Sequence, residues 1–275
     1  QTACNISKAA HNIAMGHKVA TCLTCGEENI FLGKCSARRV TTGSGNIAMG
    51  YHSGANNSDS TGQRNITIGE KTGYDLTDGS CNVIIGHYTG QNVTSGEQNI
   101  LFGRFAGQQL TTGDHNIFAG LYSGGKCTLT GGYNIGFGFH VLSRNTSGTN
   151  NIAMGCLAMS GEVVTGDSNI AIGSKAGISL TSGGDNIFLG RCAGENHSTS
   201  GQNVYLGKYA GSRLKGDNGG VNVAIGDEAL RGSSNVASNS GFFNVALGTK
   251  TGLCLTEGSY NTFIGNYAGK SNTSG

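Results

Sequence analysis

The strongest constraint on this chain is a short motif that returns about every 17 residues. The motif is an Asn, an apolar residue (Thr once), two variable residues and a Gly. Most successive anchors are 17 residues apart, and the others are 18, 19 or 22 apart. The fifteen anchors are Asn12, Asn29, Asn46, Asn65, Asn82, Asn99, Asn116, Asn134, Asn151, Asn169, Asn186, Asn203, Asn222, Asn244 and Asn261. Such a period predicts a solenoid, in which each coil completes its core by stacking on its neighbours.

The composition of one coil predicts its secondary structure. With the Asn as position 0, position 1 is Ile or Val in fourteen units, and position 3 is Met, Leu, Ile or Phe in all but one. This alternation favours a short strand that faces a core, and the Gly at position 4 in every unit ends it. Positions 11 to 14 often read L-T-x-G, which predicts a second short strand. Every insertion falls after position 9, so we expect that half of the coil to face solvent.

The expected fold is all-β, a parallel β-solenoid (β-roll or β-helix) of about fifteen 17-residue coils. It would form a single repeat domain over residues 1–275, with a partial coil at 1–11 and repeat units over 12–275.

Position 2 of the coil is unexpectedly apolar. A strand with one face in water should carry polar residues there, yet Thr67 is the only polar side chain without a ring in this column. We expect this stripe to be an interface between subunits; the alternative is a flattened coil whose own loops cover the strand. The interface candidates are Phe31, Ile84, Leu101, Phe118, Phe188, Tyr205 and Phe263.

Composition excludes several classes of protein. The chain has 49 Gly and no Pro, which excludes collagen and polyproline. A formal charge of +2 without a basic run gives no sign of a nucleic-acid partner, and no stretch is long and apolar enough to span a membrane. The 16 carboxylates are scattered and form no column along the coils, so we expect no catalytic site and no cofactor. His17, His52 and His87 share a corner of the coil but lie two coils apart, which is too far for one metal ion.

Cysteines and glycosylation sequons point to a secretory route. Of the nine Cys, Cys4 and Cys22 fall at neighbouring places in successive coils, and Cys22 with Cys25 is the rival disulfide. Seven Asn-x-Ser/Thr sequons are present, and all but Asn65 lie on the edge expected to face solvent. The glycosylation candidates are Asn5, Asn56, Asn92, Asn145, Asn196 and Asn272.

The segment from Asn261 to Gly275, N-T-F-I-G-N-Y-A-G-K-S-N-T-S-G, resembles a known kind of repeat. Tail-fibre-like proteins of bacteria and phages carry repeats written N-T-A-I-G-x-x-A-G, and the heads of YadA-like trimeric adhesins are more distantly similar. This resemblance implies a β-roll in which three chains pack the A-I-G strand towards a common axis.

These features lead to two expected functions. The first is a structural subunit of an extracellular fibre or filament on a cell or virion surface. It would bind copies of itself, as a trimer or filament, through the lengthwise stripe and by end-to-end stacking of coils. The second is an adhesin or receptor-binding shaft; an ice-binding solenoid is a weaker third, because the Thr-Thr pairs do not persist along the chain.

Overall fold

A computed structural model describes residues 10–54, 59–215, 220–235 and 239–274 of the chain. The chain divides into two compact units, Gln1–Asn134 and Ile135–Gly275, which are taken here one at a time. Both are built from the same coil, and the described residues contain fifteen strands and no helix. The predicted all-β, parallel β-solenoid fold is therefore confirmed.

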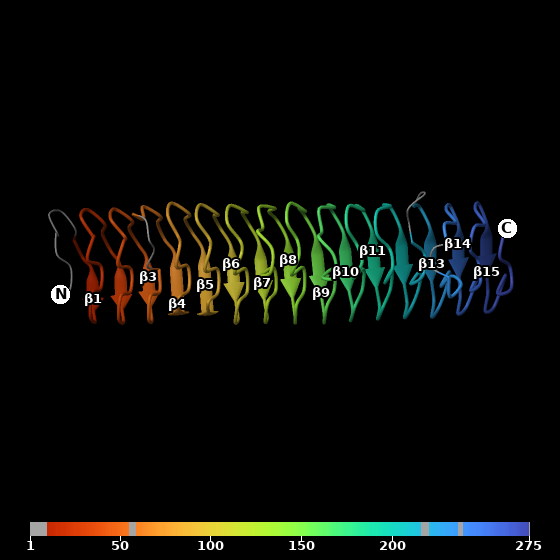
Figure 1. Cartoon of the computed structure of the whole chain (residues 1–275), viewed down its shortest axis with the longest axis horizontal. Helices are drawn as coiled ribbons and strands as arrows, with labels where there is room; N and C mark the ends of the chain where they lie inside the picture. The colour runs from red at the N-terminus through yellow and green to blue at the C-terminus, as the bar shows by residue number, and fades with distance from the viewer. Residues whose placement is uncertain (1–9, 55–58, 216–219, 236–238, 275) are drawn as a thin grey trace. The chain divides into compact units, whose positions relative to one another are not determined.

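Each coil contributes one short strand, which begins directly after the anchor Asn (Figure 1). In the first unit the strands are β1 (Ile13–Met15), β2 (Ile30–Leu32), β3 (Ile47–Met49), β4 (Ile66–Glu70), β5 (Val83–His87), β6 (Ile100–Phe102) and β7 (Ile117–Ala119). In the second they are β8 (Ile135–Phe137), β9 (Ile152–Met154), β10 (Ile170–Ile172), β11 (Ile187–Leu189), β12 (Val204–Leu206), β13 (Val223–Ile225), β14 (Val245–Leu247) and β15 (Thr262–Ile264). Neighbouring strands within a unit are parallel and in register, so that each motif position pairs with the same position of the next coil.

The turns of the coil depend on left-handed backbone at fixed positions. In the coil of Asn99 the positive φ angles are 55° at Gln98, 58° at Phe105 and 55° at Gly107, and the same places recur in the other coils. The residue before the anchor is thus left-handed, whereas the anchor is not. Tolerance of left-handed backbone therefore does not explain why the anchor is Asn.

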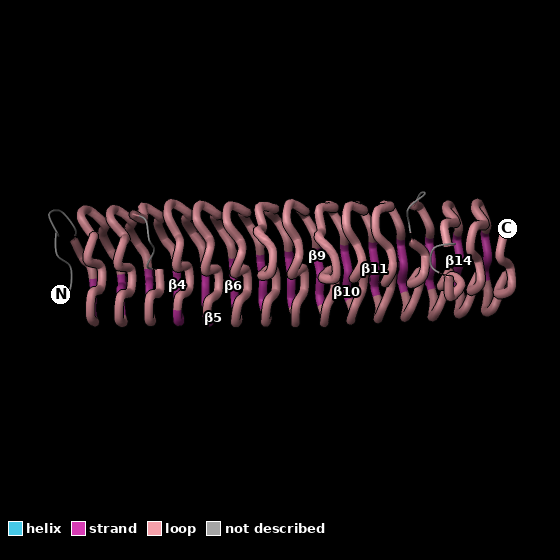
Figure 2. Tube along the Cα trace, in the orientation of Figure 1, coloured by secondary structure: helices cyan, strands magenta, loops and turns pink. Residues whose placement is uncertain are grey.

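The second predicted strand does not form. Positions 11 to 14 give only isolated bridges, such as Leu110 with Leu129 and Val40 with Ser60 (Figure 2). Leu76, Leu110 and Leu180 at position 11 are nevertheless buried, so the variable half of the coil also contributes to the core. Our expectation that this half faces solvent is therefore wrong, because the side chains at position 11 fill part of the core of the coil.

The Gly at position 4 is required by the close approach of successive coils. A Cβ atom at Gly33 would lie 2.6 Å from the carbonyl oxygen of Gly50, and one at Gly190 would lie 2.6 Å from that of Gly207. The φ angles at these two residues, 124° and 134°, are also ones that side-chain-bearing residues rarely adopt. Each coil can therefore stack on the next only if both lack a side chain here.

The anchor asparagines form a continuous buried ladder within each unit. Asn99 is fully buried, and its Oδ1 accepts hydrogen bonds from the backbone N–H (2.8 Å) and the side-chain amide (3.1 Å) of Asn116. Its Nδ2 donates to Oδ1 of Asn82 (3.1 Å) and to the carbonyl oxygen of Gly113 (2.9 Å). The Asn column therefore joins each coil to the next through hydrogen bonds.

Candidate functional site: the outward face of the sheet

The strands turn position 2 inwards, towards the core of their own coil. Side chains alternate between the two faces of a strand, and in β6 Leu101 is 0% exposed between Ile100 at 46% and Phe102 at 58%. The same alternation holds in the other strands, whose position 2 is buried or, in the two terminal coils, half-buried.

The interface candidates of the sequence analysis are therefore misplaced. Phe31, Ile84, Leu101, Phe118, Phe188 and Tyr205 are fully buried in the core, and Phe263 is half-buried in β15. The alternation of apolar residues was the only guide to the inward face, and here both faces of the strand are apolar. Position 2 is therefore neither an interface between subunits nor a surface that the coil's own loops fold back to cover. Its side chains form the core of the coil.

Positions 1 and 3 form a different apolar surface, which we call the outward face. In the first unit it consists of Ile13, Met15, Ile30, Leu32, Ile47, Met49, Ile66, Ile68, Val83, Ile85, Ile100, Phe102, Ile117 and Ala119. In the second unit it consists of Ile135, Phe137, Ile152, Met154, Ile170, Ile172, Ile187, Leu189, Val204, Leu206, Val223, Ile225, Val245, Leu247, Thr262 and Ile264. All of these residues are half-buried or exposed. Contiguous apolar surface of this kind is uncommon on soluble monomers and usually marks an interaction site.

The corner of the coil directly after the strand carries aromatic rings and cations. In the first unit Tyr88, Phe105 and Tyr122 stack at the corner after the strand, with ring centroids 5.7 and 4.7 Å apart. The Arg104 guanidinium lies 4.7 Å from the Phe105 ring centroid, and Lys126 Nζ lies 5.8 Å from that of Tyr122. These contacts are of the cation–π type, and the rings remain half-exposed.

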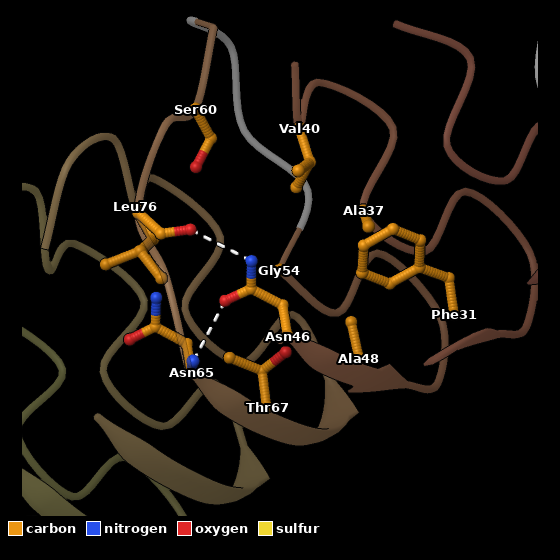
Figure 3. Close-up of a pocket in the computed structure, with 11 residues that line it drawn as sticks. Phe31, Ala37, Val40, Asn46, Ala48, Gly54, Ser60, Asn65, Thr67 and Leu76 are labelled. Carbon is orange, nitrogen blue, oxygen red and sulfur yellow. Dashed lines mark hydrogen bonds between the residues drawn. The ribbon is translucent and has the colours of Figure 1, made fainter. Parts of the chain in front are cut away.

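The cavity beside Asn46 is too small for an organic ligand. Apolar side chains such as Phe31 and Leu76 line it together with Asn46, Asn65 and Thr67 (Figure 3), and the space open to a water molecule is about 10 Å³. That volume is roughly enough for one water. The two hydrogen bonds of the Asn46 side chain, to the Gly62 carbonyl and from the Asn65 N–H, continue the ladder through the cavity wall.

Thr67 is stabilised in the core beside this cavity by its neighbours. The hydroxyl of Ser53 donates to the Thr67 carbonyl oxygen (2.6 Å), lies 3.0 Å from the Thr67 hydroxyl and lies 3.0 Å from that of Thr72. A polar side chain can occupy an inward position here because buried hydroxyls satisfy one another.

His197 is a buried histidine that the sequence analysis did not single out. It takes the inward place of Leu at position 11, is 1% exposed and packs edge-on against Phe188 and Tyr205. Its Nε2 lies 3.0 Å from the Ser200 hydroxyl and 3.1 Å from Nδ2 of Asn203. The hydroxyl of Tyr205 donates to Oδ1 of Asn203 (3.1 Å), and burial raises the pKa of Tyr205. These groups are core residues that hydrogen-bond one another.

The glycosylation candidates do not share one environment. Asn145 is 1% exposed, because position 11 faces the core; the expectation that it lies on a solvent edge is wrong. Asn92, Asn196 and Asn272 are half-buried, and Asn65 is buried in the ladder as expected. Asn5 and Asn56 lie outside the described residues.

The cysteines of the described residues carry free thiols. Cys22 and Cys25 are both unpaired, so their predicted disulfide is not formed, and Cys4 lies outside the described residues. In the same part of the chain no three His, Cys, Asp or Glu side chains are gathered as metal ligands. Nor does any helix there have the length and apolar character needed to cross a bilayer.

No protein-family model, curated protein or solved structure matches the chain. The functional argument therefore depends on the surface geometry described above.

Proposed function

We propose that the protein is a structural subunit of an extracellular fibre or filament and has no catalytic role. Identical copies would associate through the outward face, with three copies around a common axis as the arrangement implied by the resemblance to trimeric β-rolls. The observation that supports this most is the continuous apolar surface at positions 1 and 3, on the side of the strand opposite the core.

Two further observations support a structural role. Apart from the His197 imidazole, the interior polar side chains described above are amides and hydroxyls, many of which hydrogen-bond from coil to coil, as in Ser53 with Thr67 and Asn99 with Asn116. In addition, the stacking contacts repeat from coil to coil with little change. Such regularity is typical of a protein whose role depends on its extended repeat structure and not on one local binding or catalytic site.

The proposal is tested by placing charges on the outward face. Ile100→Asp combined with Phe102→Asp should dissociate the assembly, because two unpaired carboxylates would be buried in an apolar contact. Sedimentation velocity should then show the 28.1 kDa chain in place of the wild-type oligomer. The control is Thr112→Asp with Thr128→Asp, which adds the same charge at exposed positions away from the strands. An outward-face variant that assembles as the wild type does would contradict the proposal.

The alternative is a binding shaft, such as an adhesin or receptor-binding fibre. The stacked rings of Tyr88, Phe105 and Tyr122 with their neighbouring cations favour this candidate, because aromatic and cationic side chains recur at ligand surfaces. A glycan-array screen of the wild type and of Phe105→Ala would test it. Binding that is lost in the variant, without loss of assembly, would favour the shaft.

A further inference from the structure

Two short rows of residues border the outward face in each unit. The N-margin is the pair of residues directly before each anchor Asn, and the C-margin is the pair directly after each position-4 Gly. All of these residues except Cys35 and Cys192 are exposed or half-buried, and the apolar positions of the strand separate the two margins of every coil.

The two margins carry opposite charge. In the first unit the N-margin holds Glu27, Glu28, Glu97 and Asp114 against Arg64, and the C-margin holds Lys18, Lys34, Lys71 and Arg104 against Glu70. In the second unit the N-margin holds Asp167 and Asp185, and the C-margin holds Lys175, Arg191, Lys208 and Lys250 against Asp227 and Glu228. The 16 carboxylates form no continuous column, but of the nine beside the strands six lie on the N-margin and three on the C-margin, where most of the cations beside the strands lie.

Several of the charges on these margins are available to a partner, whereas Glu70 and Glu228 already pair with His87 (3.5 Å) and Arg231 (3.3 Å). Among the described residues Lys34, Arg104, Glu27 and Glu97 are exposed and belong to none of the ion pairs. The Asp114 carboxylate accepts a hydrogen bond from the backbone N–H of Glu97 (2.7 Å), which holds it at the margin.

The charges also match strand by strand. The strands β2, β6, β10 and β11 each have an acid on the N-margin and a cation on the C-margin. At β4 the pattern does not hold: Arg64 lies before the strand, and the C-margin pairs Glu70, the last residue of the strand, with Lys71. No strand has net charge of the same sign on both margins. At β15 both margins are aromatic instead, with Tyr260 before the strand and Tyr267 after it.

This pattern distinguishes between two ways of joining outward faces. If two copies are related by rotation about an axis parallel to the direction of strand stacking, the N-margin of one copy lies against the C-margin of the other at the same strand. Lys34 then meets Glu27 or Glu28, and Arg104 meets Glu97. If the copies run antiparallel, each N-margin lies against an N-margin, and the acids face one another. Like charges placed together disfavour an arrangement, whereas complementary charges fix its orientation.

We infer that the partner of the outward face is a second copy of this chain that runs in the same direction, related by a cyclic axis parallel to the strand stack, with equivalent strands at the same level. This inference rests on the proposed function, because it specifies how the outward faces meet. Exposed ion pairs add little affinity, so the apolar residues hold the copies together and the margins select direction and level.

The test is a charge-swap series in the first unit. The basic-margin variant is Lys34→Glu with Arg104→Glu, the acidic-margin variant is Glu27→Lys with Glu97→Lys, and a third variant carries all four changes. None of these residues has a positive φ, so the swaps add no backbone strain. The control, Arg144→Glu with Lys215→Glu, changes net charge as the basic-margin variant does, but its two exposed positions lie in the variable half of the coil and outside the margins. Circular dichroism and the thermal midpoint establish that each variant folds.

Each two-residue variant should raise the dissociation constant of the assembly by about tenfold or more in low salt. The four-residue variant should recover most of the lost affinity, because the charges at β6 are complementary again and the lysine at position 27 neutralises Glu28 at β2. The control should match the wild type. If each two-residue variant assembles as the wild type does, or the four-residue variant stays as weak as they are, the inference is overturned.

Two further outcomes separate the inference from the proposed function. If the wild type is a monomer, the proposed function fails and the inference fails with it. If the outward-face variant dissociates but the margin variants do not, only the inference fails. Heparin, a sulfated polysaccharide, is the probe for a competing role of the basic margin. Heparin binding that is lost in the basic-margin variant while assembly is unchanged would assign that margin to a polyanion and overturn the inference.

Discussion

The anchor asparagines connect successive coils through hydrogen bonds that use both ends of the side-chain amide. In the coil of Asn99, the carbonyl oxygen accepts from the next anchor, and the amide nitrogen donates to the previous anchor and to Gly113. Only Asn supplies an acceptor and two donors at this length, which explains why the anchor is the same residue in every unit.

Replacement of one anchor should therefore be costly. Asn99→Ala leaves the buried N–H of Asn116 and the Gly113 carbonyl without the partners they have now, which should lower the free energy of unfolding by about 2–4 kcal/mol. Urea denaturation followed by circular dichroism measures this loss, and Thr112→Ala at an exposed position is the control. An Asn99→Ala midpoint equal to that of the control would show that the ladder contributes little.

His52 makes stability depend on pH. Its half-buried ring packs against Tyr51 and Tyr74, and its pKa is lowered, first by burial and then by the positive charges of Arg38, Lys71 and Lys34. The unfolded chain then binds a proton at a higher pH than the folded chain. The contribution of His52 is complete above its ordinary pKa and is lost as the pH falls through that value towards the folded one.

The thermal midpoint should accordingly fall less steeply in His52→Asn than in the wild type between about pH 7.5 and 5. Asn suits the test because it accepts the left-handed backbone at this position, where φ is 54°. Equal slopes for the two proteins would mean that His52 does not contribute.

At the scale of the coil, the side chains at positions 2 and 8 share the same space in the core. Where position 2 is large, position 8 is Gly or, in the coil of Phe31, Ala, and a Cβ at Gly124 would lie 2.5 Å from the ring of Phe118. Where position 2 is small, position 8 can be large, as in Gly136 with Leu142. Position 2 can therefore vary from Gly to Tyr because its neighbour in the same coil compensates.

This exchange predicts a compensating pair of substitutions. Gly124→Leu alone should overpack the coil, and Phe118→Gly alone should leave a cavity that costs about 3–5 kcal/mol. The combined variant reproduces the Gly–Leu pair of another coil and should lose less stability than Phe118→Gly. Thermal unfolding of the three variants measures the coupling, and a combined loss equal to the sum of the single losses would contradict it.

The sequence predicted the coil, its stacking and the need for Gly at position 4, because these follow from a strict period. It did not predict which side of the strand is inward, since Ile100, Leu101 and Phe102 are all apolar and alternation alone cannot orient them. The margins were missed for a different reason. The carboxylates were considered alone, whereas their order is visible only when Glu97 and Arg104 are compared across one strand.

At the scale of the whole molecule, we propose that copies of the chain assemble on the outward face, with its apolar centre and oppositely charged margins. Hydrophobic burial would provide the affinity, and charge would provide the direction.

The most direct measurement is the mass of the wild-type protein in solution, by sedimentation equilibrium over a wide range of concentration. The account predicts a mass that is a multiple of 28.1 kDa, with three copies as the expected number. A mass of 28.1 kDa at every concentration would contradict it.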